Sequence, residues 1–103
     1  MRYEIVLSPE AIADLRGLRA DFRALVRDGI EEHLRHAPTA TSRARIKRLR
    51  GLSRPQYRLR IDDIRVFYDV VDDRVEILAI VRKADADDWL HRIGEPDEAD
   101  STL

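Results

Sequence analysis

The stretch from Tyr57 to Val71, YRLRIDDIRVFYDVV, decides the fold, because apolar and polar residues alternate along it on both sides of Asp62-Asp63. Alternation with a period of two predicts β-strands, and an aspartate pair between two such runs suits a tight turn. With this pair as a two-residue loop, Arg60 lies directly opposite Arg65 on the neighbouring strand. A third alternating run follows a second aspartate pair, at positions 72 and 73. The sequence therefore predicts an antiparallel three-stranded meander with strands Pro55–Ile61, Ile64–Val71 and Val75–Val81.

A strand and two helices are predicted ahead of the meander. Residues Arg2–Leu7 alternate and favour a strand, and Ser8-Pro9-Glu10 begins a helix, because serine suits the N-cap and proline the first turn. A second helix is expected to be capped by Asp21, to end before Pro38 and to bury the stripe Phe22, Leu25, Val26, Ile30 and Leu34. Gly29 within it indicates a close backbone approach or a tolerated weakness.

The fold class that follows is α+β. It consists of an N-terminal strand, a two-helix hairpin, the antiparallel three-stranded meander and a short C-terminal helix. Residues 39–55, TATSRARIKRLRGLSRP, lack a clear period and are expected to form a basic connector without strands. A single domain is expected over residues 1–93, and residues 94–103 have the composition of an acidic, flexible tail.

The register sorts the meander's side chains into two faces. One is almost wholly apolar and is expected to pack against the helices: Tyr57, Leu59, Ile61, Ile64, Val66, Tyr68, Val70, Val75, Ile77, Ala79 and Val81. The other face carries Arg58, Arg60, Arg65, Phe67, Leu78, Ile80 and Arg82. Like charges opposite each other destabilise a sheet, so Arg60 beside Arg65 costs free energy in the unbound protein. A bound phosphodiester would make the same pair of positive charges favourable. The alternative is that these arginines extend into solvent or pair with Asp69, Glu76 or the acidic tail.

Charge is strongly segregated along a chain whose formal net charge is −1. Between positions 43 and 65 there are nine basic residues against two acidic ones, and between positions 84 and 103 seven acidic residues against one basic. A continuous cationic track suits a polyanion such as RNA.

Several classes of site and location are disfavoured by the composition. The chain has no cysteine, which excludes disulfides and a thiolate nucleophile. It has no apolar run of about 18 residues and no signal-peptide pattern, so a cytoplasmic protein without a membrane segment is expected. His33 and His36 share one side of the second helix, but exposed helix histidines are commoner than metal ligands, and neither a metal nor another cofactor is expected.

Over residues 2–89 the chain resembles the RelE branch of the RelE/ParE toxin superfamily. The resemblance is carried by a strand and two helices, then KRLRGL, YRLRIDDIRVFYDV and VEILAIVRK. It implies a small ribonuclease that cuts messenger RNA in the ribosomal A site, without metal, through attack of a 2′-hydroxyl on the adjacent phosphate. It also implies a cognate antitoxin, the ribosome and messenger RNA as partners, and no small-molecule cofactor.

The catalytic residues that the resemblance implies are Arg60, Arg65 and Arg82. The predicted RNA-binding residues are Lys47, Arg48, Arg50, Arg58, Phe67 and Lys83. Among these, Phe67 is singled out by its place on the face with the arginines, where its ring would stack on a base. Arg82 or Lys83 falls near the late basic position that protonates the leaving oxygen. Arg60 stands where lysine-using relatives have their base, and arginine is effectively never deprotonated. The family's late tyrosine has no match, and the nearest aromatic, Trp89, is expected to anchor the last helix in the core.

Two other functions stay open at this point. One is a ParE-like protein that poisons DNA gyrase, although such chains typically have a longer helical hairpin. The other is a catalytically degenerate homologue that binds RNA or antitoxin without cutting.

Overall fold

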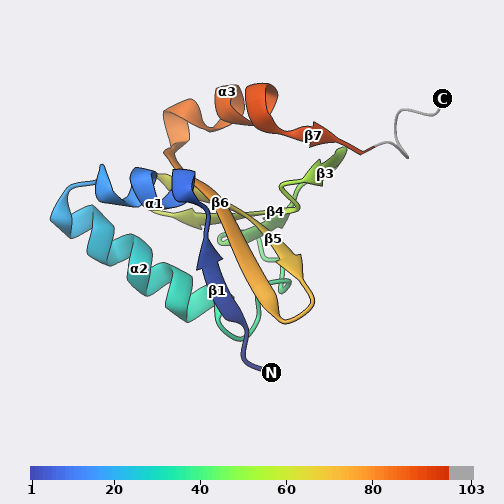
Figure 1. Cartoon of the computed structure of the whole chain (residues 1–103), viewed down its shortest axis with the longest axis horizontal. Helices are drawn as coiled ribbons and strands as arrows, with labels where there is room; N and C mark the ends of the chain where they lie inside the picture. Colours follow the sequence, from blue (N-terminus) through green and yellow to red (C-terminus); the bar gives the residue numbers. More distant parts are fainter. Residues whose placement is uncertain (98–103) are drawn as a thin grey trace.

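The computed structural model describes residues 1–97 of the 103-residue chain. In chain order the elements are β1 (Glu4–Leu7), α1 (Pro9–Arg16), α2 (Ala20–Leu34), β2 (Ile46–Arg48), β3 (Leu52–Arg54), β4 (Tyr57–Ile61), β5 (Ile64–Val71), β6 (Arg74–Arg82), α3 (Lys83–Ile93) and β7 (Glu95–Pro96). This arrangement confirms the predicted α+β class, with a first strand, two helices, a meander and a last helix (Figure 1). No helix within residues 1–97 is both long and apolar enough to span a membrane.

A five-stranded sheet with the order β1-β6-β5-β4-β2 forms the centre of the molecule. β1 runs parallel to β6, and the other neighbours are antiparallel. The predicted β4–β5 register is confirmed from Tyr57 opposite Tyr68 to Ile61 opposite Ile64, which places Arg60 opposite Arg65. Asp62 and Asp72 adopt left-handed φ angles of 52° and 55°, a conformation that aspartate tolerates in turns.

Three short strands were not predicted. β2 and β3 lie in the presumed basic connector, and β3 pairs with β7, which begins in the presumed tail. The connector prediction is therefore wrong, as is the start of the tail at residue 94; residues 98–103 lie outside the described part. These strands escape pattern recognition because they are two or three residues long and sit at sheet edges, where charged side chains are favoured.

The helix boundaries follow the predicted capping only in part. The Ser8 hydroxyl accepts a hydrogen bond from the Ala11 N–H at 3.0 Å, which confirms the first N-cap. The second N-cap is Arg19 and not Asp21, whose carboxylate instead accepts hydrogen bonds from the Arg19 side chain. Leu25 is 42% exposed, so its predicted burial is also wrong.

Gly29 allows α2 to lie close to β4. A Cβ atom at this position would stand 2.5 Å from Cδ1 of Ile61, far inside van der Waals contact. This close backbone approach is one of the two readings that the sequence allows.

A β-bulge between β5 and β6 changes which side chains of β6 share a face. Tyr68 pairs with Ile77 but Phe67 pairs with Ala79, so Leu78 is the extra residue. Beyond the bulge every β6 side chain points to the opposite face from that predicted. Ile80 consequently joins the core under α1 and α2, and Ala79 packs with Phe67 on the other face.

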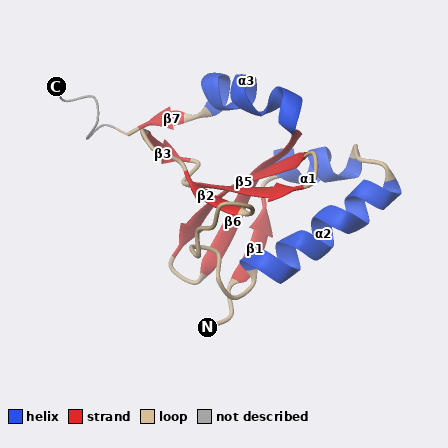
Figure 2. Cartoon of the chain, turned by 180° about the vertical axis from the view of Figure 1, so that it is seen from behind, coloured by secondary structure: helices blue, strands red, loops and turns tan. Residues whose placement is uncertain are grey.

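Two apolar clusters cover the two faces of the sheet. The larger cluster contains Val26, Leu34, Leu59 and Tyr68 and lies beneath α1 and α2. The smaller cluster joins Leu49, Phe67 and Ala79 to Ala86 and partly buried Trp89 of α3. Because Phe67 and Tyr68 are consecutive in β5, these clusters lie on opposite faces. Figure 2 shows α3 on the far side of the sheet from α2.

Candidate nucleic-acid interface

Basic side chains from three neighbouring strands meet on the face of the sheet away from α1 and α2. Lys47 of β2 lies opposite Arg58 of β4, which lies opposite Phe67 of β5. In the next cross-strand row, Arg60 lies opposite Arg65. Directly opposed residues of an antiparallel pair have Cβ atoms about 4.5–5.5 Å apart. Lys47, Arg58, Arg60 and Arg65 are called the cationic cluster below.

Arg65 is the fixed member of the cationic cluster. Its side chain is 5% exposed, and Nη1 donates hydrogen bonds to the carbonyl oxygens of Asp62 at 2.9 Å and Ile64 at 3.1 Å. Burial, followed by the charges of Arg58 and Arg60, lowers the pKa of Arg65, and Asp63 opposes this shift. The turn carbonyls therefore hold a buried positive charge close to two other guanidinium groups.

The cationic cluster has no carboxylate partner within residues 1–97, where none of the ion pairs includes Lys47, Arg58, Arg60 or Arg65. The two acids that could have paired with it are engaged elsewhere. Asp69 lies 3.7 Å from Nε of Arg54, and Glu76 lies 3.3 Å from Arg74. The N–H at Nε of Arg58 is buried and donates to no acceptor among the described residues. The exposed cations of Lys47 and Arg60 are thus available to an external anion, whereas Arg65 acts through its buried charge.

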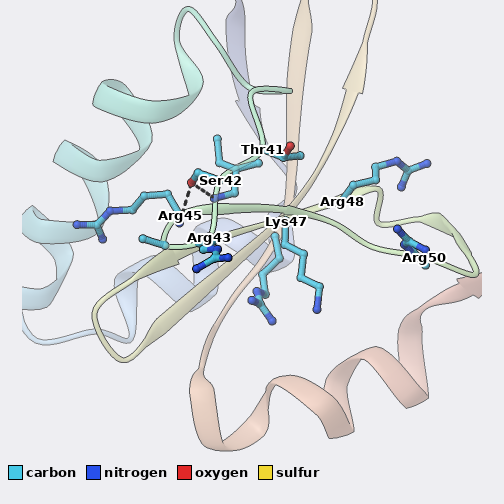
Figure 3. A pocket seen from close by; sticks show the side chains of 10 residues that line it. Thr41, Ser42, Arg43, Arg45, Lys47, Arg48 and Arg50 are labelled. Carbon is cyan, nitrogen blue, oxygen red and sulfur yellow. Dashed lines mark hydrogen bonds between the residues drawn. The ribbon is translucent and has the colours of Figure 1, made fainter.

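A basic groove adjoins the cationic cluster along β2. It has a volume of about 610 Å³ and is lined by Arg43, Arg45, Lys47, Arg48, Arg50 and Arg58, together with Thr41, Ser42, Ala44 and Ile46 (Figure 3). No acidic side chain is among the residues that line it. Such a groove has the charge to follow a nucleic-acid backbone.

Lys47 and Arg48 leave β2 in different directions. Lys47 points toward the side of α3 in Figure 3, whereas Arg48 extends away from it. The Arg48 guanidinium lies 5.2 Å from the ring centroid of Tyr57 and donates a hydrogen bond to the Gln56 carbonyl at 2.7 Å. Alternation along β2 therefore places Lys47 with the cationic cluster and Arg48 on the rim of the groove.

Comparison with known proteins identifies the family. Residues 5–87 match the model of a family described as the ParE toxin of the type II toxin–antitoxin system parDE. The chain belongs to the RelE/ParE toxin superfamily. A search of curated proteins gave no significant match.

Solved toxin–antitoxin complexes contain chains with the same fold. A chain of the RelB–RelE complex from Methanococcus jannaschii has a TM-score of 0.63 and 18% identity, over 82% of this chain and 96% of that one. A chain of the RelBE2 complex from Mycobacterium tuberculosis has a TM-score of 0.63 and 24% identity, and the match covers 80% of this chain and 99% of that one. A chain of the archaeal RelE–RelB complex from Pyrococcus horikoshii OT3 has a TM-score of 0.60 and 24% identity, and the match covers 81% of this chain and 97% of that one. At these identities the likeness establishes the RelE-like fold.

Phe67 cannot take the base-stacking position that the sequence suggests for this RelE/ParE-type chain. Its side chain is fully buried, and its ring stacks on Trp89 with centroids 4.8 Å apart and planes at 10°. The prediction that Phe67 contacts RNA is wrong because α3 covers this part of the sheet, which sequence reasoning left exposed. The expectation that Trp89 anchors the last helix is confirmed.

Arg82 does not lie with the cationic cluster. It pairs with Ile64, a member of the core beneath α1 and α2, so its side chain belongs to that face. There it lines a hollow with Asp14 and Asp85. The predicted shared face of Arg82 with Arg60 and Arg65 is wrong, because the bulge at Leu78 shifts the end of β6 by one residue.

The remaining predicted residues divide between the groove and the helix end. Arg50 lines the basic groove, whereas Lys83 begins α3, where its N–H donates to the Asp63 carbonyl at 2.9 Å, and its side chain does not line the groove. Arg43 and Arg45 also line the groove; the sequence places them in the basic segment, but they are not among the predicted RNA-binding residues. Their only sequence signal is the excess of basic residues around them.

His33 lies in α2, but His36 lies beyond its end at Leu34, so the prediction that both are on this helix is wrong, and they do not gather ligands for a metal. His33 lies 3.8 Å from the neighbouring carboxylate of Glu32, and Nδ1 of His36 lies 3.3 Å from the carbonyl of Met1. Within the described residues, no group of three or more histidine or acidic side chains is placed to hold an ion.

Proposed function

We propose that this toxin-family chain is an endoribonuclease that cuts messenger RNA on the ribosome, through attack of a 2′-hydroxyl on the adjacent phosphate and without a metal ion. The observation that carries the proposal is the cationic cluster on β2, β4 and β5, which has no carboxylate partner within residues 1–97. Crowded guanidinium groups destabilise a free protein, and a phosphodiester makes the same crowding favourable.

The geometry suits stabilisation of charge on the reacting phosphate. Arg65 is held by the Asp62 and Ile64 carbonyls, so little reorganisation is required when negative charge develops beside it. Arg60 is exposed, and Arg58 is half-buried but lines the basic groove, so both guanidinium groups can donate to phosphate oxygens. The role proposed for Arg65 is electrostatic stabilisation from its buried position, and the role proposed for Arg58 and Arg60 is donation to the oxygens of the reacting phosphate, including in the transition state.

Arg43, Arg45, Arg48 and Arg50 supply the rest of the RNA path. Their positions around the groove allow several phosphates of a single strand to be bound at once. Because ribosome-bound messenger is the proposed substrate, the proposed location is the cytoplasm.

A cognate antitoxin is the second proposed partner, since the matched structures are antitoxin–toxin complexes. An acidic antitoxin segment lying along the basic groove would satisfy the same cations as RNA and block access to it.

DNA gyrase inhibition is the second candidate function. One observation favours it: the family model that matches residues 5–87 is that of the ParE toxin. Against it, α1 has 8 residues and α2 has 15, a shorter hairpin than the ParE resemblance implies, and gyrase poisoning requires no cationic cluster. The third candidate function is that of a degenerate homologue that binds RNA or antitoxin without cutting. It is suggested by the arginine at position 60, which cannot accept a proton as a base would.

Two parallel reactions distinguish these functions. The purified chain is added to a reconstituted translation reaction, where primer extension maps cuts in the message, and to a gyrase reaction on supercoiled plasmid. We expect cuts within codons held in the A site, no gyrase-dependent DNA breaks, and loss of the cuts in Arg58→Gln. Arg27→Gln, which removes an exposed charge from α2, serves as the control that retains them. DNA breaks with an intact message would contradict the proposal, as would an intact message in both reactions.

A further inference from the structure

Within the basic groove, Lys47 is the only basic lining side chain that is not an arginine, and an amine, unlike a guanidinium, has a neutral form that can accept a proton. The other five basic lining residues are arginines, which stay protonated. The chain has only one other lysine, Lys83, and it does not line the groove. Attack by a 2′-hydroxyl needs a group that accepts its proton, and the arginine at position 60 cannot serve.

The hydroxyls that line the groove are not alternatives to Lys47. Ser42 Oγ accepts hydrogen bonds from the N–H groups of Arg45 at 3.1 Å and Ile46 at 3.4 Å, which fixes it as part of the turn into β2. A serine or threonine hydroxyl also does not hold an additional proton near neutral pH.

Lys47 occupies a suitable position for proton transfer. It lies directly opposite Arg58, in the cross-strand row beside that of Arg60 and Arg65. A phosphate bound by Arg58 and Arg60 would therefore lie within reach of its side chain, along with the 2′-hydroxyl of the preceding nucleotide. Lys47 is exposed, and β2 is an edge strand of the sheet, so RNA can approach it from the open side.

We propose that Lys47 is the proton acceptor in RNA cleavage by this chain, an inference that rests on the ribonuclease function proposed above. The neutral Nζ takes the proton of the 2′-hydroxyl as the 2′-oxygen bonds to phosphorus. The bond from phosphorus to the 5′-oxygen breaks, and that oxygen leaves with the electron pair and takes a proton from water. The products are a 2′,3′-cyclic phosphate and a 5′-hydroxyl end, and the Lys47 ammonium returns its proton to solvent.

The absence of cysteine allows the charge of Lys47 to be separated from its basicity. Lys47→Cys introduces the only thiol of the chain. Alkylation with 2-bromoethylamine rebuilds an amine of nearly the same length, whereas (2-bromoethyl)trimethylammonium installs a permanent cation that carries no exchangeable proton. Lys47→Arg is the genetic counterpart of the second product. Wild type and Arg27→Cys, an exposed site on α2, are treated with the same reagents to control for side reactions.

Two quantities are measured for each protein: RNA affinity, and single-turnover cleavage of messenger in stalled translation complexes. We expect cleavage by Lys47→Cys to fall about 10²- to 10⁴-fold, the range typical of a lost general base. The aminoethyl product should recover to within about tenfold of wild type. The trimethylammonium product and Lys47→Arg should recover RNA affinity but not cleavage.

Wild-type rates in the trimethylammonium product or in Lys47→Arg would overturn the proton-acceptor role, because charge alone would then suffice. Equal loss in the aminoethyl and trimethylammonium products, with each folded by circular dichroism, would overturn it as well. A wild-type chain that cuts no message overturns the ribonuclease function itself, and the role of Lys47 falls with it.

Discussion

Replacing Arg60 by glutamine should stabilise the free protein, because Arg60 lies opposite the buried charge of Arg65 without an acid between them. Like charges in opposed sheet positions cost about 0.2–1 kcal/mol. Since Arg60 is exposed to solvent, we expect a gain in the free energy of unfolding of about 0.5 kcal/mol at low salt.

Urea denaturation measures this gain. With a slope of about 1 kcal/mol per molar urea, typical of a small domain, the midpoint should rise by roughly 0.5 M. The gain should shrink toward zero in about 1 M salt, where the Debye length is about 3 Å. The Arg27→Gln control should change the midpoint little at either salt concentration. The same Arg60→Gln variant should bind single-stranded RNA with a log–log salt slope smaller by about 0.7. A lower midpoint in Arg60→Gln, or a gain that persists in high salt, would refute the reasoning.

Three other predictions concern the scaffold of the site. Gly29→Ala should destabilise the protein by about 1–2 kcal/mol in urea denaturation, because overpacking against Ile61 exceeds the helix-propensity gain of about 1 kcal/mol. Adding Ile61→Val to the Gly29→Ala chain should recover part of the loss. If the effects of the two substitutions on the free energy of unfolding were simply additive, this contact would be contradicted. Burial raises the pKa of Asp69, so the folded state binds that proton more tightly than the unfolded chain, and the free energy of unfolding should fall as pH rises from the ordinary value of 3.8 through the raised one. Asp69→Asn keeps an acceptor for the Gln56 N–H but removes the titrating carboxyl. The free energy of unfolding of this variant, relative to that of wild type, should therefore rise with pH over that interval. A difference that stays constant with pH would show that Asp69 is not responsible. Ser8→Ala should cost about 1 kcal/mol by thermal or urea unfolding through the lost N-cap, and an unchanged midpoint would contradict that role.

The fold was predictable where a local pattern determines a local structure. The aspartate pairs determine the loop lengths and hence the β4–β5 register, and Ser8-Pro9 determines where α1 begins. The bulge at Leu78 has no such pattern, because an alternating run can be read without a gap. One inserted residue then reversed every predicted face beyond it, including that of Arg82.

The candidate site was predictable to the extent that it depends on that register. Arg60 and Arg65 are neighbours because the hairpin makes them so. The place of Lys47 depends on a three-residue edge strand whose pairing involves backbone groups, and side-chain patterns do not report that pairing. The burial of Phe67 depends on where α3 packs, a long-range contact that its own strand does not encode.

The central claim is that RNA is cut by the cationic cluster on β2, β4 and β5, and the most direct test compares charge removal on the two faces of the sheet. The rate of A-site messenger cleavage in stalled translation complexes is measured for Arg58→Gln and for Arg82→Gln, each of which removes one positive charge. The account predicts a loss of about 10²-fold or more for Arg58→Gln, the scale of one lost transition-state donor, and a rate close to wild type for Arg82→Gln. Loss of cleavage in Arg82→Gln with full activity in Arg58→Gln would contradict it.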